Sequence, residues 1–300
     1  MISYSIKELS EISGIKAHTI RIWEQRYNLL SPSRTDTNIR LYGDEDLKKL
    51  LNVSQLVSQG KKISHISRMT DAQISEEIDE FISKSSSKNL PYDAIINQMI
   101  IAISTFDEIL FDKVFSDSTT RWNLIDTYNN VIYPMLVKTG LMWSRSDLMP
   151  AQEHFLSNLI RQKLFSIIDY LPLQAKPEQT WVLFLGEQEE HEIGLLFANF
   201  VLKQSKQKVI YLGSNVPYEN LAAVVEQVKP THLYTFFVRN QPKENIKSYI
   251  NKLKSDFKNV HICISGRVDL IGTKSADRKI TLIKDIYQLN QLLAKPDATI

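Results

Sequence analysis

From residue 180 onward, short apolar runs that suit strands alternate with stretches that suit helices, and this alternation constrains the fold more than any other feature of the chain. The strand-like runs are Trp181–Leu185, Lys208–Leu212, His232–Val238, His261–Ile264 and Lys279–Ile283. Strands that alternate with helices form βαβ units, and such units build a parallel sheet covered by helices on both faces. This region therefore predicts a doubly wound, flavodoxin-like parallel sheet.

The sequence before this region has a different texture, which indicates a multidomain protein of α and α/β class. Short helical patterns fill residues 1–75, a polar stretch that ends in Pro91 has the composition of a linker, and longer helical patterns occupy residues 92–172. A length of 300 residues also suggests two or three domains, at roughly 100–200 residues each. We predict a domain of short helices at 1–75, a linker at 76–91, a helix bundle at 92–175 and the sheet domain at 176–300.

Cysteine content and hydropathy point to a reducing, aqueous compartment. Cys263 is the single cysteine of the sequence, so neither a disulfide nor a cysteine zinc site can form within it. No run of about 18 apolar residues is present, and the first residues lack the apolar core of a signal peptide. We expect a cytoplasmic protein that does not contact a membrane. The net charge of +2 means that nucleic-acid binding would depend on a local basic patch.

The first 30 residues show the pattern of two short helices joined at a glycine. Ser5 and Glu8 have the spacing of a capping box at a helix start, and Gly14 ends that helix. A second helix is predicted over residues 17–27, with its basic residues off its apolar face. Two short helices in this order form a helix-turn-helix, which places the second helix in a DNA major groove.

The segment after the second helix is turn-forming and basic, as in a winged helix-turn-helix. Arg34, Arg40 and Tyr42 flank a turn at Asp36–Asn38 and can donate hydrogen bonds to phosphates. Between Lys16 and Tyr42 the chain has five Lys or Arg and two Asp or Glu residues, a modest excess of positive charge. The alternative interpretation is that these arginines are only solvated surface charges.

The string Thr19–Leu30 and the basic segment after it resemble the DNA-binding domain of the MerR family of transcription regulators, over residues 4–70. Lys16 stands where that family usually has a small hydroxyl residue, so a weaker helix cap is expected. The resemblance implies DNA contacts from His18, Thr19, Arg21, Arg26, Arg34, Arg40 and Tyr42. One such reader covers a short half-site, so we expect a homo-oligomer, a dimer or tetramer, on an inverted repeat of double-stranded DNA.

The helical region carries Trp143 and, ten residues later, the pair Glu153 and His154. On residue types alone, this region could be a spacer or a dimerisation bundle. The spacing resembles the helical cap of light-sensing cobalamin regulators of the CarH type, which implies that these three side chains lie near the adenosyl group of adenosylcobalamin. Ser144 departs from the pattern, because light-sensing members commonly have a histidine there and a hydroxyl is a poor cobalt ligand.

Gly186 ends the first strand-like run, and Glu189, His191 and Gly194 follow before the next helix. Ligands of open α/β sheets bind at the carboxyl ends of the strands, commonly beside the first strand, so His191 is expected at the ligand-binding edge. A carboxylate beside a histidine orients the ring and makes it more basic, which suits a metal ligand. The alternative is a surface histidine in a charged turn.

The pattern Glu189-x-His191-x-x-Gly194 resembles the cobalamin-binding signature of B12-dependent methyltransferases, mutases and B12 regulators. The resemblance implies that His191 binds cobalt from below, that Glu189 hydrogen-bonds this histidine and that Gly194 lets the backbone approach the corrin. It implies further cofactor contacts at Ser214, Thr235, Ser265 and Gly266. Phe237 is bulkier than the family's leucine, and Ser265 replaces a glycine where the nucleotide tail of the cofactor would thread.

Three functions of different classes follow from these patterns. The first is a transcription regulator and photoreceptor that senses cobalamin, as adenosylcobalamin, by changing its oligomeric state and its binding to an operator. The second is a MerR-type regulator with a B12-binding fold that acts without B12, through a protein partner or another ligand. The third is a corrinoid carrier for a methyltransferase, against which the N-terminal reader argues. The sequence shows neither a nucleophile–base triad nor a GxGxxG loop, so we expect no catalytic residues and no enzyme.

Overall fold

The computed structural model describes residues 3–84, 91–144, 150–173, 179–239, 242–266 and 279–294. The chain divides into two compact units, Met1–Leu156 and Ser157–Ile300. The division falls within helix α9 (Pro150–Asp169) and not at the boundary expected between residues 175 and 176. The first unit therefore contains the N-terminal domain, the helix bundle and the first turns of α9, and the second contains the rest of α9 and the sheet.

The first unit begins with two short helices, α1 (Ile6–Ser13) and α2 (Ala17–Tyr27), as the sequence predicts. Ser5 and Glu8 form the expected capping box at the start of α1. Gly14 ends that helix in the left-handed conformation, at a φ of 72°, which a residue without a Cβ adopts at little cost. Within the described residues, the side chain of Lys16 makes no capping hydrogen bond to α2, as its lack of a short hydroxyl leads us to expect.

Two short strands form the wing. Strand β1 (Ser33–Arg34) pairs antiparallel with β2 (Arg40–Leu41). Thr35 closes the turn between them: its carbonyl accepts from the N–H of Asn38 at 2.8 Å, and its hydroxyl accepts from the N–H of Ile39 at 3.0 Å. Helices α3 (Asp44–Ser58) and α4 (Ile63–Ile66) follow. The core of this domain contains Leu9, Ile12, Ile20, Trp23, Leu47, Leu50 and Leu51.

Helix α5 (Asp71–Lys84) runs into the segment expected to be a linker, residues 76–91. The linker prediction is wrong as far as Lys84, because Ile74 and Ile78, four residues apart, are both buried on one face of this helix. Its other face is strongly polar, which is why the segment has the composition of a linker.

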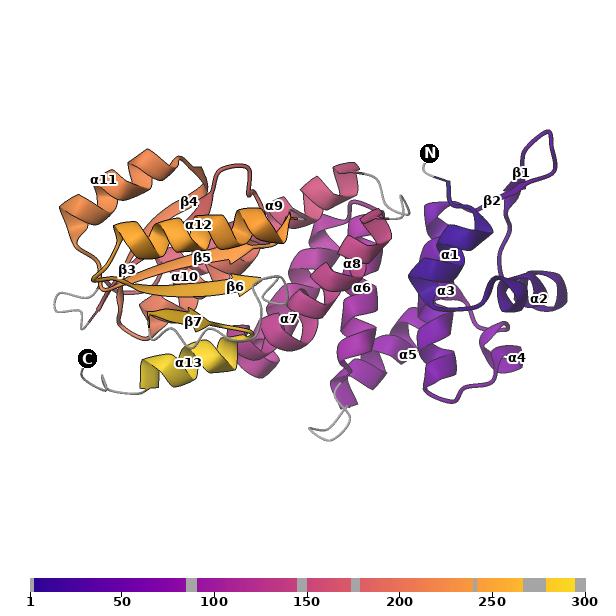
Figure 1. The fold of residues 1–300 in the computed structure, drawn as a ribbon. Coiled ribbons are helices and arrows are strands. Elements are labelled where there is room, and N and C mark those ends of the chain that lie inside the picture. The colour runs from indigo at the N-terminus through magenta and orange to yellow at the C-terminus, as the bar shows by residue number, and fades with distance from the viewer. Residues whose placement is uncertain are drawn as a thin grey trace. The chain divides into compact units, whose positions relative to one another are not determined.

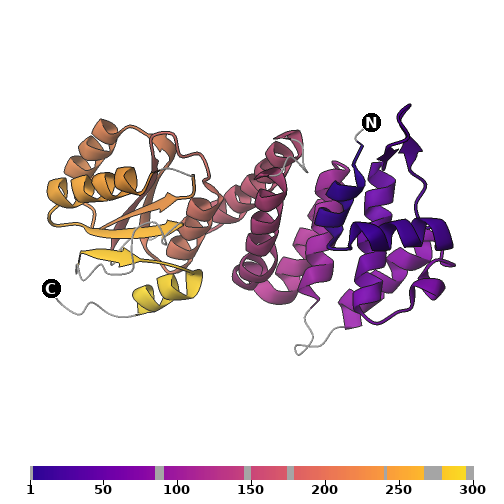
Figure 2. The same cartoon turned by 45° about the vertical axis from the view of Figure 1, so that its right-hand side comes forward.

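The bundle consists of α5, α6 (Tyr92–Ser104), α7 (Glu108–Thr127), the π-helix η1 (Tyr128–Ile132), α8 (Tyr133–Ser144) and the start of α9. Helix α6 packs against α7 and α8, and it is buried over most of its length because apolar residues occupy nearly all of its faces. Figure 1 and Figure 2 show α6, α7 and α8 beside one another. Asn123 interrupts α7 at a φ of 71°, and its side chain accepts the N–H of Asp126 at 3.0 Å, which restarts the helix.

The second unit contains a five-stranded sheet in which all strands are parallel, in the order β4-β3-β5-β6-β7. The strands are β3 (Thr180–Gly186), β4 (Lys208–Val216), β5 (His232–Phe237), β6 (His261–Gly266) and β7 (Ile280–Leu282). This is the 2-1-3-4-5 order of flavodoxin-like folds, so the predicted doubly wound sheet is confirmed. The strand order reverses at β3 and β5, which places the topological switch point between their carboxyl ends.

Helices cover both faces of this sheet. They are α10 (Ile193–Gln204), α11 (Tyr218–Val228), α12 (Lys243–Asp256) and α13 (Ile286–Ala294). Helices α11 and α12 lie on one face, over an apolar core that includes Val182, Phe184 and Leu233, and α10 lies on the other (Figure 1). Burial on both faces explains why the strands are continuous apolar runs in the sequence. In the parts of the chain that the structure describes, no helix has the length and hydropathy to cross a membrane.

Candidate functional sites

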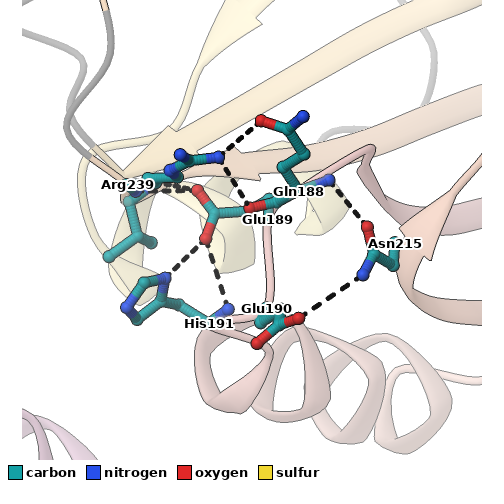
Figure 3. Close-up of polar contacts among 7 residues, drawn as sticks. Gln188, Glu189, Glu190, His191, Asn215 and Arg239 are labelled. Atoms are coloured by element: carbon teal, nitrogen blue, oxygen red, sulfur yellow. Dashed lines mark hydrogen bonds and ion pairs between the residues drawn. The ribbon is translucent and has the colours of Figure 1, made fainter.

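The loop between β3 and α10 is built around the carboxylate of Glu189, whose side chain is only 6% exposed. Its Oε1 accepts hydrogen bonds from Nδ1 of His191 at 2.6 Å and from the backbone N–H of the same residue at 3.2 Å. Its Oε2 accepts from the N–H groups of Val238 at 2.9 Å and Arg239 at 2.7 Å, which directly follow β5. Glu189 thus ties the loop after β3 to the end of β5, at the switch point of the sheet (Figure 3).

These contacts determine the ionisation of Glu189. Burial opposes the charged form, but hydrogen bonds from the His191 ring and from three backbone N–H groups outweigh it and lower the pKa of Glu189 to about 2. At neutral pH the side chain is a carboxylate that can only accept hydrogen bonds, so Nδ1 of His191 carries a proton. In the neutral ring, Nε2 then holds the lone pair that a metal ion requires.

The His191 ring is at the surface although its carboxylate partner is buried, since its side chain is 59% exposed. An exposed imidazole whose orientation and tautomer are set by a buried carboxylate is the usual arrangement of a histidine metal ligand. A histidine in an ordinary charged turn has no need of a carboxylate that is itself held by three backbone N–H groups. The geometry therefore favours a ligand role over the alternative of a simple surface residue.

Two residues that the sequence analysis did not single out brace this loop (Figure 3). Gln188 and Asn215 both have positive φ, 65° and 60°. The side chain of Asn215 accepts from the N–H of Gln188 at 2.7 Å and donates to Glu190 at 3.4 Å. The guanidinium of Arg239 donates to the side-chain oxygen of Gln188 at 2.7 Å. The loop is therefore held from β4 on one side and from the end of β5 on the other.

A second buried carboxylate, Glu192, precedes α10. Nη2 of Arg161 in α9 lies 2.8 Å from Glu192, and Tyr211 of β4 donates its hydroxyl to it at 3.0 Å. Burial first, and then the charge and hydrogen bond of Glu192, raise the pKa of Tyr211, so the phenol remains a donor. These contacts fix the start of α10 against the sheet.

In the first unit, α2 presents a polar and basic face to solvent. Its exposed or partly exposed side chains include His18, Thr19, Arg21 and Arg26. Ile20 and Trp23 face the core. A helix with a buried apolar stripe and an exposed basic face, preceded by a short helix and a glycine, has the layout of a recognition helix.

Arg40 and Tyr42, two of the predicted phosphate contacts, both bind Glu24 of α2. Nε of Arg40 lies 3.0 Å from one carboxylate oxygen of Glu24, and the Tyr42 hydroxyl donates to the other at 2.9 Å. Tyr42 is fully buried, and this burial together with Glu24 raises its pKa. The prediction that Tyr42 contacts phosphate is therefore wrong, because its hydroxyl points into the domain. Arg34 is exposed on the wing, with Nη1 2.6 Å from Oδ1 of Asn38.

Comparison with known proteins finds two family models that match the first 167 residues of the chain. Residues 4–73 match the family model of the MerR HTH family regulatory protein, and residues 69–167 match the model of a B12 binding domain. The chain therefore contains a segment similar to a MerR-type helix-turn-helix domain, followed by one similar to a B12 binding domain. The second match begins just before α5 and ends within α9, so it covers the helical part that precedes the sheet.

Two relatives from Myxococcus xanthus align with most of the chain. The HTH-type transcriptional repressor CarH is 28% identical over 255 residues, which cover 84% of each chain. The HTH-type transcriptional repressor CarA is 26% identical over 247 residues, which cover 82% of this chain and 80% of the relative. Among solved structures, the monomethylamine corrinoid protein of Methanosarcina barkeri has a TM-score of 0.52 at 13% identity and covers 67% of this chain and 93% of its own. That likeness concerns the fold alone.

Gly194 is the last residue of the pattern Glu189-x-His191-x-x-Gly194, and packing explains why it has no side chain. A Cβ at this position would lie 2.9 Å from the ring of Phe236 in β5. Phe236 or α10 would have to move to accept it. The predicted role of Gly194, close approach of the backbone to a corrin, stays a prediction beside this structural reason.

Thr235, by contrast, has the features of a ligand-binding residue. It is buried in β5, and among the described residues its hydroxyl has no hydrogen-bond partner. A buried hydroxyl without a partner costs free energy unless a ligand or water pairs with it. Thr235 therefore fits a polar group of a bound cofactor. Ser214, near the end of β4, is partly buried.

Ser265 and Gly266 have structural roles that differ from the predicted ones. The buried hydroxyl of Ser265 donates to the carbonyl of Ile283 at 2.7 Å and pairs with the hydroxyl of Tyr234 at 2.8 Å. A Cβ on Gly266, where φ is 94°, would lie 2.3 Å from the carbonyl oxygen of Phe237. The geometry does not support a cofactor contact from Ser265, because both of its partners lie within the protein. Gly266 is required by the close approach of β5 and β6.

The predicted cap residues belong to the first unit. The backbone of α8 includes Trp143 and Ser144, but their side chains lie outside the described part of the structure. Glu153 and His154 lie in the first turn of α9, with Oε2 and Nδ1 3.3 Å apart, and His154 is 73% exposed. The structure thus brings together Glu153 with His154 and Glu189 with His191. Contact of either pair with a cofactor remains a prediction.

Proposed function

We propose that this chain is a transcription regulator that senses cobalamin through its bundle and sheet and changes its binding to DNA in response. The observation that carries the proposal is the Glu189–His191 pair, held at the switch point of the sheet in a chain that also has a MerR-type reader. The buried hydroxyl of Thr235 in β5, which has no hydrogen-bond partner among the described residues, gives further support. Because the relatives that span most of the chain are transcriptional repressors by name, we propose regulation and not catalysis.

In this proposal His191 holds the cofactor through Nε2, and Glu189 keeps the ring in the required orientation and tautomer. Cobalamin would supply a cobalt ion for this histidine to bind and, in the adenosyl form, the light-sensitive chemistry of the cofactor. Trp143, Glu153 and His154 would lie beside the adenosyl group. Ser144 offers only a hydroxyl, so we propose no second protein ligand for cobalt after illumination.

On the DNA side, α2 reads the operator and the wing contacts its backbone. The proposed contacts are His18, Thr19, Arg21, Arg26 and Arg34. Arg40 pairs with Glu24 instead of a phosphate. One reader recognises a half-site, so specific binding needs a dimer or tetramer on an inverted repeat. Cobalamin changes DNA affinity only if its own affinity differs between the oligomeric state that binds DNA and the state that does not.

The first test is the visible absorption spectrum of the purified chain after incubation with adenosylcobalamin in the dark and removal of free cofactor. We expect the wild-type chain to retain a corrinoid with a histidine-ligated spectrum and the His191→Ala variant to lose it. His65→Ala is the matched control, because His65 is an exposed histidine of α4, outside the sheet unit. A histidine-ligated spectrum in His191→Ala would contradict the role of His191, and a wild-type chain that retains no corrinoid would contradict cobalamin sensing.

A second candidate function is a MerR-type regulator that acts without B12, through a protein partner or another ligand. Ser265 favours it, because its hydroxyl is paired with Tyr234 and Ile283 at the position where the family resemblance places the nucleotide tail. Sequence-specific DNA binding by a wild-type chain that retains no cobalamin would support this candidate over the first.

A further inference from the structure

Side-chain amides cross the contact between the winged helix-turn-helix domain and the bundle. Gln98 of α6 donates to Asn52 of α3 at 3.0 Å, and Asn97 donates to Gln55 at 3.2 Å. A third amide, that of Gln152, comes from the first turn of α9. Hydrogen bonds depend steeply on distance and angle, so contacts of this kind respond to small movements of one helix against another.

Gln152 is fully buried and has partners in two parts of the first unit. Its amide nitrogen donates to the hydroxyl of Tyr4 at 3.3 Å and to the carbonyl of Ser104, at the end of α6, at 3.1 Å. In the sequence it directly precedes Glu153 and His154, the predicted cap residues. The first turn of α9 is therefore in direct contact with Tyr4.

Tyr4 in turn holds the base of the wing. Its backbone pairs with that of Tyr42 in both directions, at 2.8 and 2.9 Å. Its hydroxyl donates to Asp44, the first residue of α3, at 3.2 Å. Tyr42 follows β2 directly and donates to Glu24 on the recognition helix at 2.9 Å. A short series of contacts thus leads from α9 to both DNA-reading elements.

We infer that Gln152 is a positioning residue that couples the bundle to the DNA-reading surface through Tyr4. The inference rests on the proposed function and adds the connection by which an event at Glu153 and His154 reaches the wing and α2. A shift of α9 that withdraws the amide leaves the buried Tyr4 hydroxyl with one partner fewer, and the backbone pairing with Tyr42 loosens. Coupling of this kind is a difference in DNA affinity between two states, so it is measurable with variants.

The test measures dissociation constants for a DNA duplex that the wild-type chain has selected from a random pool, with and without adenosylcobalamin in the dark. We compare each variant with the wild type by the ratio of its dissociation constants without and with the cofactor. In Gln152→Met and in Tyr4→Phe this ratio should be closer to one than in the wild type, by a factor of about 2 to 12, which is the range of one net hydrogen bond. The double variant should show no further change. Gln98→Met is the matched control, because it removes an amide from the same contact without touching Tyr4, and it should keep the wild-type ratio.

A second readout needs no cofactor. In the cofactor-free chain, hydrogen exchange of the Tyr42 N–H should be faster in Gln152→Met than in the wild type or Gln98→Met, because its acceptor is the carbonyl of Tyr4. Thermal unfolding confirms that each variant is folded at the temperature of the assays.

The outcomes separate the inference from the proposed function. A wild-type chain whose DNA affinity does not respond to cobalamin would overturn the proposed function, while faster exchange at Tyr42 in Gln152→Met would still support the connection. Unchanged exchange at Tyr42 in Gln152→Met, or a wild-type cobalamin response retained in both Gln152→Met and Tyr4→Phe, would overturn the inference.

Discussion

Replacement of Glu189 by glutamine tests whether a buried carboxylate holds the candidate cofactor loop in place. The carboxylate accepts four hydrogen bonds, from the ring and N–H of His191 and from the N–H groups of Val238 and Arg239. Glutamine has nearly the same shape, but it keeps one acceptor oxygen and directs an NH₂ group at one pair of these donors. We expect Glu189→Gln to destabilise the sheet unit.

The size of this effect follows from the ionisation of Glu189. A pKa of about 2, against an ordinary value of 4.5, means that the folded loop favours the carboxylate by about 3 kcal/mol. Two lost hydrogen bonds to a charged group, at about 1.5 kcal/mol or more each, give a similar figure. Because the folded pKa lies below the unfolded one, this stabilisation is complete above about pH 5 and is lost as the pH falls toward 2. About 1 kcal/mol of it should be gone at pH 3.5.

The assay measures the free energy of unfolding in urea at pH 7 and pH 3.5. Unfolding is detected by pulsed hydrogen exchange in peptides from β3 and β5, which report the sheet unit separately from the first unit. Glu190→Gln is the control, because Glu190 is an exposed neighbour whose side chain accepts only a long hydrogen bond, from Asn215 at 3.4 Å, within the described residues. Equal destabilisation by Glu189→Gln and Glu190→Gln would refute the reasoning. A loss in Glu189→Gln that is as large at pH 3.5 as at pH 7 would show that the charge of the carboxylate is not its cause.

The DNA-reading surface and the sheet give further predictions. In mobility-shift titrations, Arg21→Ala should weaken operator binding by about 10-fold or more, and an unchanged affinity would refute the assignment of α2 as the recognition helix. Arg34→Ala should reduce the slope of log affinity against log salt by about one, whereas Arg40→Ala should not, because a carboxylate of α2 already pairs with it. In thermal unfolding, Gly266→Ala should cost about 2 kcal/mol or more, because its Cβ would meet a backbone carbonyl; Gly186→Ala, whose Cβ would meet only a tyrosine side chain, should cost less.

Much of the fold could be predicted because the strands of this sheet are buried on both faces. Each observed strand begins within one residue of its predicted start. Strand β4 extends to Val216, beyond the predicted end at Leu212, and its last residues pair with β3 through register shifts. A hydropathy pattern does not show this extension, because Ser214 and Asn215 are polar. Backbone hydrogen bonds keep these two residues in the strand, and burial does not.

Helix α2 and the pairing of Glu189 with His191 could also be predicted, but the contacts that hold these elements in place could be predicted only in part. Glu189 was predicted because it lies two residues from His191, and one loop can bring such neighbours together. Glu24 lies 16 residues from Arg40 and 18 from Tyr42, and in the sequence it is only an acidic residue in a basic segment. Its role depends on how the wing folds back on α2, which no local spacing shows.

Gln152 and Tyr4 extend this argument, because 148 residues separate them in the sequence. Glu189 and the proposed cobalt ligand His191 share a short loop, so their spacing shows in the sequence. The positioning residues Gln152 and Tyr4 are brought together by the packing of separate segments, and their contact shows only in the structure. The two pairs should therefore differ in experiment: a variant at His191 should abolish cofactor retention, whereas variants at Gln152 or Tyr4 should retain cobalamin and lose part of the DNA response to it.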